Sequence, residues 1–314
     1  MENVVFLDRR TVPIPLPKPT FAHVWKEFDQ TTPTQVFERL RNATIAITNK
    51  APIRQTDLER LPDLRLIAVA ATGYDCVDVA WCREHGVAVA NIPGYAREGV
   101  AEHVFMLILA LRRNLLRYAA AVREGCWPKS PQFAILDYPI HDLYASTLGL
   151  IGYGAIAAEV ERRAKAFGMH ILVADHRGAA ARPGRTPFEE VLGRSDVISL
   201  HAPLTSETRH LVGALELRRM KPEALLINTA RGALVDAAAL ADALRAGRLG
   251  GAGIDVLAEE PPKEGHPLLD PTVPNLIVTP HVAWSSRQAL ALLAERLLAN
   301  IEAFVKGRPQ NLVS

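Results

Sequence analysis

The sequence predicts an α/β protein with two Rossmann-like domains, each built on a doubly wound parallel sheet. Three observations support this fold class. Short apolar runs rich in β-branched residues alternate with helical segments along almost the whole chain. Six such runs lie in the second half, the number of strands in a complete dinucleotide-binding sheet. The length of 314 residues suits about two domains at a typical ~100–200 residues each.

The first hundred residues form the first alternating series. Its expected strands are Val4–Leu7, Thr44–Thr48, Leu66–Ala70 and Val87–Ala90. Helices are expected near Gln35–Arg41 and Asp57–Leu61. Apolar runs of this kind are typical of parallel strands that are buried on both faces.

A long helix is predicted next, from about Arg97 to Glu124. It is apolar on most of its faces around Val104–Leu111, and a helix of that kind is usually buried against a second domain or a partner subunit. We therefore expect a homodimer formed through residues 97–124. The loop that follows carries Trp127 and Phe133, for which local packing and a subunit contact are equally good interpretations.

The second series begins at Thr147. Its expected strands are Thr147–Ile151, His170–Ala174, Val197–Leu200, Leu225–Asn228, Gly251–Asp255 and Leu276–Thr279. Its expected helices are Ala157–Ala166, Pro187–Gly193, Ala214–Met220 and Asp236–Ala246, with a last amphipathic helix over Gln288–Phe304.

These two series predict an inserted domain. Residues 97–284 would form a Rossmann domain, inserted into a flavodoxin-like domain made of residues 1–96 plus 285–314. The chain would cross between the domains near Gly94–Arg97 and Trp284–Gln288, with the active site expected in the cleft between them.

The composition excludes several classes of function. With 36 basic and 34 acidic side chains, the net charge of +2 gives no basic footprint for nucleic acid or a membrane surface. The three cysteines lack CxxC spacing, and there is no HExxH motif or Walker loop, so neither a metal site nor P-loop chemistry is expected. No signal peptide and no apolar run of bilayer length is present, so the sequence predicts a cytoplasmic protein.

A dinucleotide-binding motif follows the first strand of the second series. The strand TLGLI runs into Gly152-Tyr-Gly154, with Ala157 at the third glycine position and a helical pattern after it. Gly152 would allow the tight turn, and Gly154 would let the backbone approach a pyrophosphate at the helix N-terminus. Asp175 ends the next strand, where a carboxylate binds ribose hydroxyls and repels a 2′-phosphate. This predicts NAD rather than NADP, although the nearby Arg177 could accommodate that phosphate.

Three charged residues follow the ends of later strands. Arg231, Glu260 and His281 come after Leu225–Asn228, Gly251–Asp255 and Leu276–Thr279 respectively. Ligands of open α/β sheets bind outside the carboxyl ends of the strands, so these three residues are expected at one site. We interpret them as the catalytic set.

The motifs GYGAIA, NTARGALVD, DVLAEEPP and TPHVAWSS, together with Asp175, resemble those of the D-isomer-specific 2-hydroxyacid dehydrogenase family. The resemblance covers nearly the whole chain, because VAATGYDCVDV looks like the family's substrate-carboxylate loop. It implies NADH-dependent reduction of a small 2-oxo acid, such as hydroxypyruvate or glyoxylate, to D-glycerate or glycolate. His281 would be the acid, Glu260 would hold its other ring nitrogen, and Arg231 would bind the substrate.

The resemblance also implies the remaining site residues. Substrate binding would involve Ala71, Thr72, Gly73, Arg231 and His281. Cofactor binding would involve Gly152, Gly154, Ala155, Ile156, Asp175, His201, Ala202, Pro203, Thr208, Thr229, Ala230, Arg231, Asp255, His281, Ala283 and Trp284. Asp255 would contact the nicotinamide carboxamide. Pro203, Thr208 and Thr229, judged without the resemblance, fit plain turn or packing residues as well.

Two other functions stay open. One is a 2-hydroxyacid dehydrogenase of another substrate class, since the sequence does not define the pocket for the substrate side chain. The other is a non-catalytic NAD-sensing protein on the same fold, because a fold does not fix a function.

Overall fold

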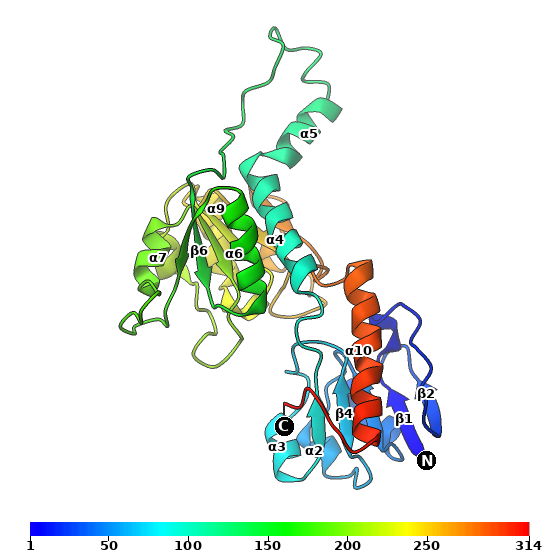
Figure 1. Ribbon diagram of the computed structural model, residues 1–314. Helices are drawn as coiled ribbons and strands as arrows, with labels where there is room; N and C mark the ends of the chain where they lie inside the picture. The colour runs from blue at the N-terminus through cyan, green and yellow to red at the C-terminus, as the bar shows by residue number, and fades with distance from the viewer. Residues whose placement is uncertain (314) are drawn as a thin grey trace. The chain divides into compact units, whose positions relative to one another are not determined.

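The computed structural model describes residues 1–313 (Figure 1). The chain divides into two compact units. Unit 1 consists of residues 1–96 with the chain from Ser285 on, and unit 2 is Arg97–Trp284. Each unit contains one parallel sheet, which confirms the predicted class of two parallel-sheet α/β domains.

The sheet of unit 1 has five strands in the order β2-β1-β3-β4-β5. Their bounds are β1 Glu2–Phe6, β2 His23–Glu27, β3 Ile45–Thr48, β4 Leu66–Val69 and β5 Ala88–Ala90. All neighbours pair in parallel. An order of 2-1-3-4-5 is that of flavodoxin-like folds. In these folds the second strand is added on one side of the first, and the third and later strands are added on its other side.

Helices cover both faces of this sheet. On one face, α1 (Val36–Leu40), α2 (Gln55–Leu58) and α3 (Val79–Glu84) pack on alternate side chains of the strands. The other alternate side chains, such as Ile45 and Leu66, are also fully buried. On that side α10 (Arg287–Val305), drawn in orange and red, runs beside β4 (Figure 1). Burial on both faces explains why β3 and β4 read as continuous apolar runs.

The sequence analysis did not predict β2 and α3. Strand β2 is an edge strand whose HVWKE side chains are mostly half-buried or exposed, so it has no apolar run. Helix α3 has six residues, which is too short for a clear helical period. Both elements depend on packing against neighbours that are distant in sequence.

Unit 2 has a six-stranded sheet in the order β11-β10-β9-β8-β6-β7. Its strands are β6 Thr147–Ile151, β7 His170–Val173, β8 Val197–Leu200, β9 Leu225–Asn228, β10 Gly251–Ile254 and β11 Leu276–Val278. All six predicted strands are confirmed, with ends that differ by at most one residue. From β6 the chain adds β7 on one side of the sheet and then β8 on the other side. The switch point therefore lies between β6 and β8, and an open α/β sheet binds its ligand at such a point.

Two helical layers enclose the sheet of unit 2. One contains α4 (Arg97–Arg112) and α6 (Ala155–Ala166), whose apolar faces share a core with the strands. The other contains α7 (Phe188–Arg194), α8 (Ala214–Arg219) and α9 (Ala237–Arg245). The four helices predicted between Ala157 and Ala246 are confirmed as α6, α7, α8 and α9, with small differences at the ends.

The single long helix predicted over Arg97–Glu124 is wrong, because the chain breaks it at Asn114. Asn114 has a φ of 49°, the left-handed conformation that asparagine tolerates better than most residues. A second helix, α5 (Leu115–Arg123), then starts in a new direction and leads into a long loop (Figure 1). The apolar face of α4 is therefore buried inside its own unit, whereas Leu115, Leu116 and Val122 of α5 are exposed.

No helix within residues 1–313 is both long enough and apolar enough to cross a membrane. The same residues contain no group of three or more His, Cys, Asp or Glu side chains that could hold a metal ion. Cys76, Cys82 and Cys126 are free thiols.

Candidate active site

The turn after β6 lies at the switch point of the sheet in unit 2. Gly152 has a φ of 84°, and a Cβ atom on it would lie 2.5 Å from the backbone nitrogen of Ala202. The chain after β8 is this close because the His201 N–H donates to the Ile151 carbonyl at 2.7 Å. Only glycine fits the first position of the motif for both reasons.

The second glycine opens the helix. Gly154 is the N-cap of α6, and a Cβ atom on it would meet nothing within 4 Å. Gly154 and Ala155 are exposed, so the N-terminus of α6 is accessible, and its unpaired N–H groups favour an anionic group. Ala157, at the third position, is fully buried against the sheet. The turn and helix thus have the form of a pyrophosphate cradle.

Asp175 follows β7 and has a buried carboxylate. Its side chain is only 1 % exposed, and it accepts hydrogen bonds from the backbone N–H groups of His176 and Arg182 at 2.8 and 2.7 Å. The Arg182 guanidinium also binds it, at 2.7 Å from Nη2 to Oδ1. The guanidinium of Arg182 is the main reason that the pKa of Asp175 lies far below its ordinary value. Asp175 is therefore ionised at neutral pH.

Arg177 does not reach Asp175 in this structure. Its Nη2 lies 2.8 Å from Oε1 of Glu216, whose side chain is 4 % exposed. Two arginines follow Asp175 in the sequence. The sequence analysis named Arg177, but Arg182 is the one that contacts the Asp175 carboxylate.

His201 begins the loop after β8. Its Nε2 lies 2.9 Å from the Ser199 hydroxyl, and burial lowers the pKa of His201 to about 4. Its imidazole is therefore neutral at physiological pH. Further along this loop, the Thr208 hydroxyl donates to the Pro203 carbonyl at 2.7 Å and accepts from the Thr205 N–H at 2.7 Å. Both hydrogen bonds of the Thr208 hydroxyl thus stay within the predicted cofactor loop and stabilise its shape.

Thr229 differs from Thr208 in this respect. It comes directly after β9, and its Oγ1 is buried with no hydrogen-bond partner among residues 1–313. A buried hydroxyl without a partner is costly, so it indicates a group that the protein alone does not supply. The next residues are braced by buried Asn228, whose side chain accepts from the Ala230 N–H and donates to the Arg231 carbonyl.

His281 and Glu260 form the central pair of the site. The His281 Nδ1 lies 2.6 Å from the Glu260 Oε2. The other Glu260 oxygen, Oε1, accepts from the Leu257 N–H at 2.8 Å, so the carboxylate is fixed at both ends. The His281 side chain is 24 % exposed, which leaves the ring accessible. His281 has a φ of 53°, an unusual conformation for a histidine and one that recurs at functional sites.

The backbone around His281 is held by Asp255. Its buried carboxylate accepts from the Thr279 hydroxyl at 2.5 Å and from the Val282 and Ala283 N–H groups at 3.0 Å each. The Asp255 side chain is not exposed at all. The carboxylate predicted to contact a carboxamide is therefore committed to three donors of its own unit. It fixes the turn that carries the histidine.

His103 is a residue of this site that the sequence analysis did not single out. From α4, its Nε2 lies 3.0 Å from the Thr279 hydroxyl and 3.5 Å from the Asp255 carboxylate. Burial lowers the pKa of His103, with the charge of Asp255 opposing that change. Because 176 positions separate His103 from Thr279, no local sequence signal could have revealed the contact.

Arg231 reaches the same edge of the sheet from β9, the neighbour of β10. Its Nη1 donates to the Ala230 carbonyl at 2.8 Å. The turn passes very close to the Glu260 segment, since a Cβ atom on Gly232 would lie 2.0 Å from the carbonyl carbon of Leu257. Glycine at 232 thus lets the turn of Arg231 pack on the segment that carries Glu260.

Together these features fit a bound dinucleotide. The glycine turn and open helix N-terminus suit a pyrophosphate, the buried carboxylate suits a ribose, and the Thr229 hydroxyl lacks a partner at the same edge of the sheet. Trp284 Nε1 donates to the His281 carbonyl at 2.9 Å and so closes the turn beyond Ala283. Ala155 and Ile156 form the first turn of α6, and Ala202 flanks Gly152.

In unit 1, the predicted substrate loop follows β4. The Thr72 hydroxyl donates to the Ile92 carbonyl at 2.8 Å, and the Ile92 N–H donates to the Ala71 carbonyl at 2.9 Å. The Asn91 side chain donates to the Thr72 carbonyl at 2.7 Å. These three hydrogen bonds join the loop to the segment after β5. They hold the loop in a defined shape at the carboxyl edge of its own sheet.

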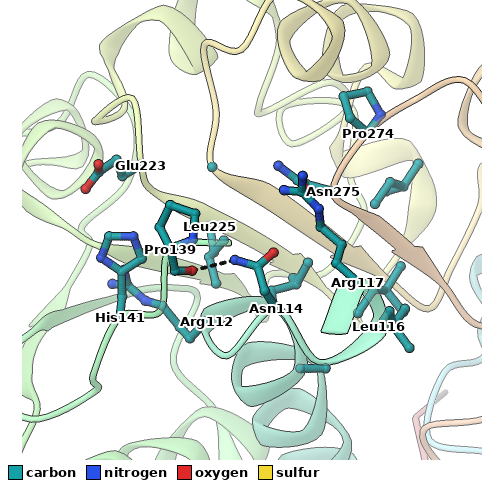
Figure 2. Close-up of a pocket in the computed structure, with 15 residues that line it drawn as sticks. Arg112, Asn114, Leu116, Arg117, Pro139, His141, Glu223, Leu225, Pro274 and Asn275 are labelled. Carbon is teal, nitrogen blue, oxygen red and sulfur yellow. Dashed lines mark hydrogen bonds between the residues drawn. The ribbon is translucent and has the colours of Figure 1, made fainter. Parts of the chain in front are cut away.

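A hollow of about 600 Å³ lies at the opposite edge of the sheet in unit 2. Its lining includes Leu225, Gly250 and Leu276, which stand at the amino ends of β9, β10 and β11. Figure 2 shows it beside the break between α4 and α5, where the Asn114 side chain donates to the Pro139 carbonyl. None of the predicted site residues lines it, so this hollow is separate from the candidate site.

Comparisons with known proteins point to one family. The family model described as "D-isomer specific 2-hydroxyacid dehydrogenase, NAD binding domain" matches residues 105–283. Glycerate dehydrogenase of Methylorubrum extorquens is 51 % identical over 313 residues, covering 99 % of each chain. Hydroxypyruvate reductase of Blautia hydrogenotrophica is 35 % identical and covers 91 % of each chain.

A solved structure gives a similar result. The crystal structure of D-lactate dehydrogenase from Aquifex aeolicus, complexed with NAD and lactic acid, superimposes with a TM-score of 0.82 at 29 % identity. The alignment covers 98 % of this chain and 96 % of that one.

Proposed function

Because the chain belongs to the D-isomer-specific 2-hydroxyacid dehydrogenase family and is an NAD-dependent oxidoreductase, we propose that it reduces hydroxypyruvate and glyoxylate with NADH. The products are D-glycerate and glycolate, and the reverse oxidation uses the same groups. The observation that carries this proposal is the contact of 2.6 Å between His281 and Glu260. The names of the relatives, glycerate dehydrogenase and hydroxypyruvate reductase, favour these substrates.

His281 is the acid in the direction of reduction. Glu260 binds its Nδ1, which leaves Nε2 to donate a proton to the carbonyl oxygen of the substrate. The adjacent carboxylate stabilises the imidazolium and fixes the orientation of the ring. In the direction of oxidation the neutral imidazole accepts the hydroxyl proton at the same nitrogen.

Arg231 binds the substrate. Its guanidinium is permanently charged and planar, so one side chain can pair with the substrate carboxylate and polarise the neighbouring carbonyl. Asn228 and Gly232 keep the backbone of this turn in place.

The nicotinamide ring, when bound, supplies or accepts the hydride. In this proposal Gly152, Gly154 and the first turn of α6 hold the pyrophosphate, Asp175 holds the adenosine ribose, and Thr229 donates or accepts a hydrogen bond through its free hydroxyl. The remaining cofactor contacts come from the loops after β8, β10 and β11.

We assign the substrate role of unit 1 to Ala71–Gly73. Backbone N–H groups of this turn are suited to bind a substrate carboxylate. Residues 97–284 are then the NAD-binding domain, and residues 1–96 plus 285–314 the substrate domain.

We also propose a cytoplasmic homodimer. Three free thiols suit a reducing compartment. The exposed apolar side chains of α5 and the next loop, Leu115, Leu116, Val122, Trp127 and Phe133, suit a contact between two copies better than the buried face of α4 does. A monomeric mass by light scattering would refute the dimer.

A substrate panel tests the function. The value of kcat/KM should be highest for hydroxypyruvate and glyoxylate, and at least about tenfold lower for bulky branched 2-oxo acids. A preference for a bulky acid would assign the chain to another substrate class. If every 2-oxo acid failed to oxidise NADH while NADH still bound, the chain would be a non-catalytic NAD sensor.

A further inference from the structure

The carboxylate of Asp175 is saturated by donors from its own loop. Its Oδ1 accepts from the His176 N–H and from Nη2 of Arg182, at 2.8 and 2.7 Å. Its Oδ2 accepts from the Arg182 N–H and Nε, at 2.7 and 3.0 Å. A carboxylate offers about four lone-pair positions. A ribose diol can therefore reach Asp175 only if it displaces the Arg182 guanidinium.

The backbone fixes the loop that carries Arg182 beside β7. The Asp175 N–H donates to the Thr186 carbonyl at 2.9 Å, and the Thr186 N–H donates to the Val173 carbonyl at 2.8 Å. These two bonds close the base of the loop. Arg182 also donates its backbone N–H to Asp175. The backbone of the loop therefore fixes this pair, in addition to the contact between the two side chains.

The two partners differ strongly in exposure. The Asp175 side chain is 1 % exposed, whereas that of Arg182 is 61 % exposed. The guanidinium thus covers the carboxylate and presents a positive group to solvent. Its Nε and Nη2 are used on Asp175, which leaves Nη1 for another acceptor.

This arrangement changes the argument for cofactor choice. A bare carboxylate at the end of β7 repels a 2′-phosphate and so favours NAD. Here a cation compensates the negative charge, and a guanidinium fork suits phosphate oxygens in its geometry and charge. Arg177, the other candidate for this role, is held by Glu216.

We propose that Arg182 is a cofactor-specificity residue, through which the enzyme binds NADP(H) as well as NAD(H). The ribose diol of NAD(H) displaces the guanidinium from Asp175. The 2′-phosphate of NADP(H) binds the guanidinium instead. This inference rests on the proposed function only in placing the adenosine ribose at Asp175.

Calorimetric titration of the protein with NAD⁺ and with NADP⁺, without substrate or turnover, tests the proposal. In the wild type the two Kd values should lie within about tenfold of each other. Arg182→Ala should weaken NADP⁺ binding by about 10–100-fold, the usual effect of losing hydrogen bonds to a charged group. NAD⁺ should bind as well as before or more tightly, because its ribose no longer competes with a guanidinium.

Two further variants make the test specific. Arg182→Lys keeps the charge without the fork, and its affinity for NADP⁺ should lie between those of the wild type and the alanine variant. Arg177→Gln removes one positive charge two positions from Asp175 and with it the ion pair to Glu216. It should leave both Kd values within about threefold of the wild type.

Three results would overturn the inference: wild-type binding of NADP⁺ more than about 100-fold weaker than that of NAD⁺, equal losses for both dinucleotides in Arg182→Ala, or a loss in Arg177→Gln as large as in Arg182→Ala. Tight NAD⁺ binding in those cases would leave the proposed function intact. If the wild type bound neither dinucleotide, the proposed function would fail together with this inference.

Discussion

Nδ1 of His281 lies 2.6 Å from Oε2 of Glu260, and the other oxygen of that carboxylate accepts from the Leu257 N–H. Glu260 is thus a fixed positioning residue and not a mobile surface acid. It determines which ring nitrogen of His281 is left for the substrate.

Glu260→Gln should therefore change the pH dependence of catalysis. The amide cannot stabilise an imidazolium, so the rate of reduction should begin to fall at a lower pH than in the wild type, while KM changes less than kcat. Glu259→Gln is the matched control, because Glu259 is exposed and pairs only with Lys263 among the contacts described. Superimposable pH–rate profiles of wild type and Glu260→Gln would remove Glu260 from this role.

Arg231→Lys should show that the planar fork matters as well as the charge. Lysine keeps one positive charge but cannot pair with a carboxylate and a carbonyl in the same geometry. We expect a loss of about 100-fold in kcat/KM, with KM raised and kcat lowered. Arg218→Lys, in an exposed position of α8, should behave as the wild type. A loss of less than about threefold in Arg231→Lys would mean that Arg231 acts as a charge alone.

Gly232→Ala and Gly193→Ala should have opposite effects on stability. A Cβ atom at 232 would lie 2.0 Å from the Leu257 carbonyl carbon, so the backbone must shift. We expect this to lower the unfolding free energy by about 1–3 kcal/mol. In α7, a Cβ atom at 193 would meet only the Arg219 carbonyl at 3.8 Å, and alanine should stabilise the helix by up to about 1 kcal/mol. Urea unfolding of both variants checks the two signs, and equal effects would contradict the close packing at 232.

His201 should make the protein less stable in acid. Burial lowers the pKa of His201 to about 4 from an ordinary 6.5, so protonation favours the unfolded chain. This contribution is complete above pH 6.5 and is lost as the pH falls towards 4. Between pH 7 and pH 5 the wild type should lose about 2 kcal/mol more unfolding free energy than His201→Asn. Equal losses in the two proteins would show that His201 is not buried as a neutral ring.

The sequence predicted those parts of the fold whose signals are local. Each strand of the sheet in unit 2 is a compact apolar run, and each was found. Edge strand β2 was not, because its side chains face solvent and its pairing with β1 depends on residues about twenty positions away. The break at Asn114 was missed for a similar reason, since the apolar pattern continues across it and the Pro139 carbonyl that binds its side chain lies 25 positions further on.

The site shows the same division. The positions of Arg231, Glu260 and His281 after strand ends predicted them as one set, and the glycine spacing predicted the cofactor turn. They could not predict that Arg182 covers Asp175, because that contact depends on the path of a loop, nor that His103 supports the Thr279 hydroxyl from a distant helix. Contacts of this kind follow from tertiary structure alone.

The role of His281 as the acid is tested most directly by His281→Ala. Steady-state reduction of hydroxypyruvate and the Kd for NADH should be measured on the same preparation. We predict that kcat falls by about 10²–10⁴-fold, the usual contribution of a general acid, while the Kd for NADH stays within about threefold of the wild type. A kcat within about tenfold of the wild type, at unchanged NADH affinity, would contradict the account.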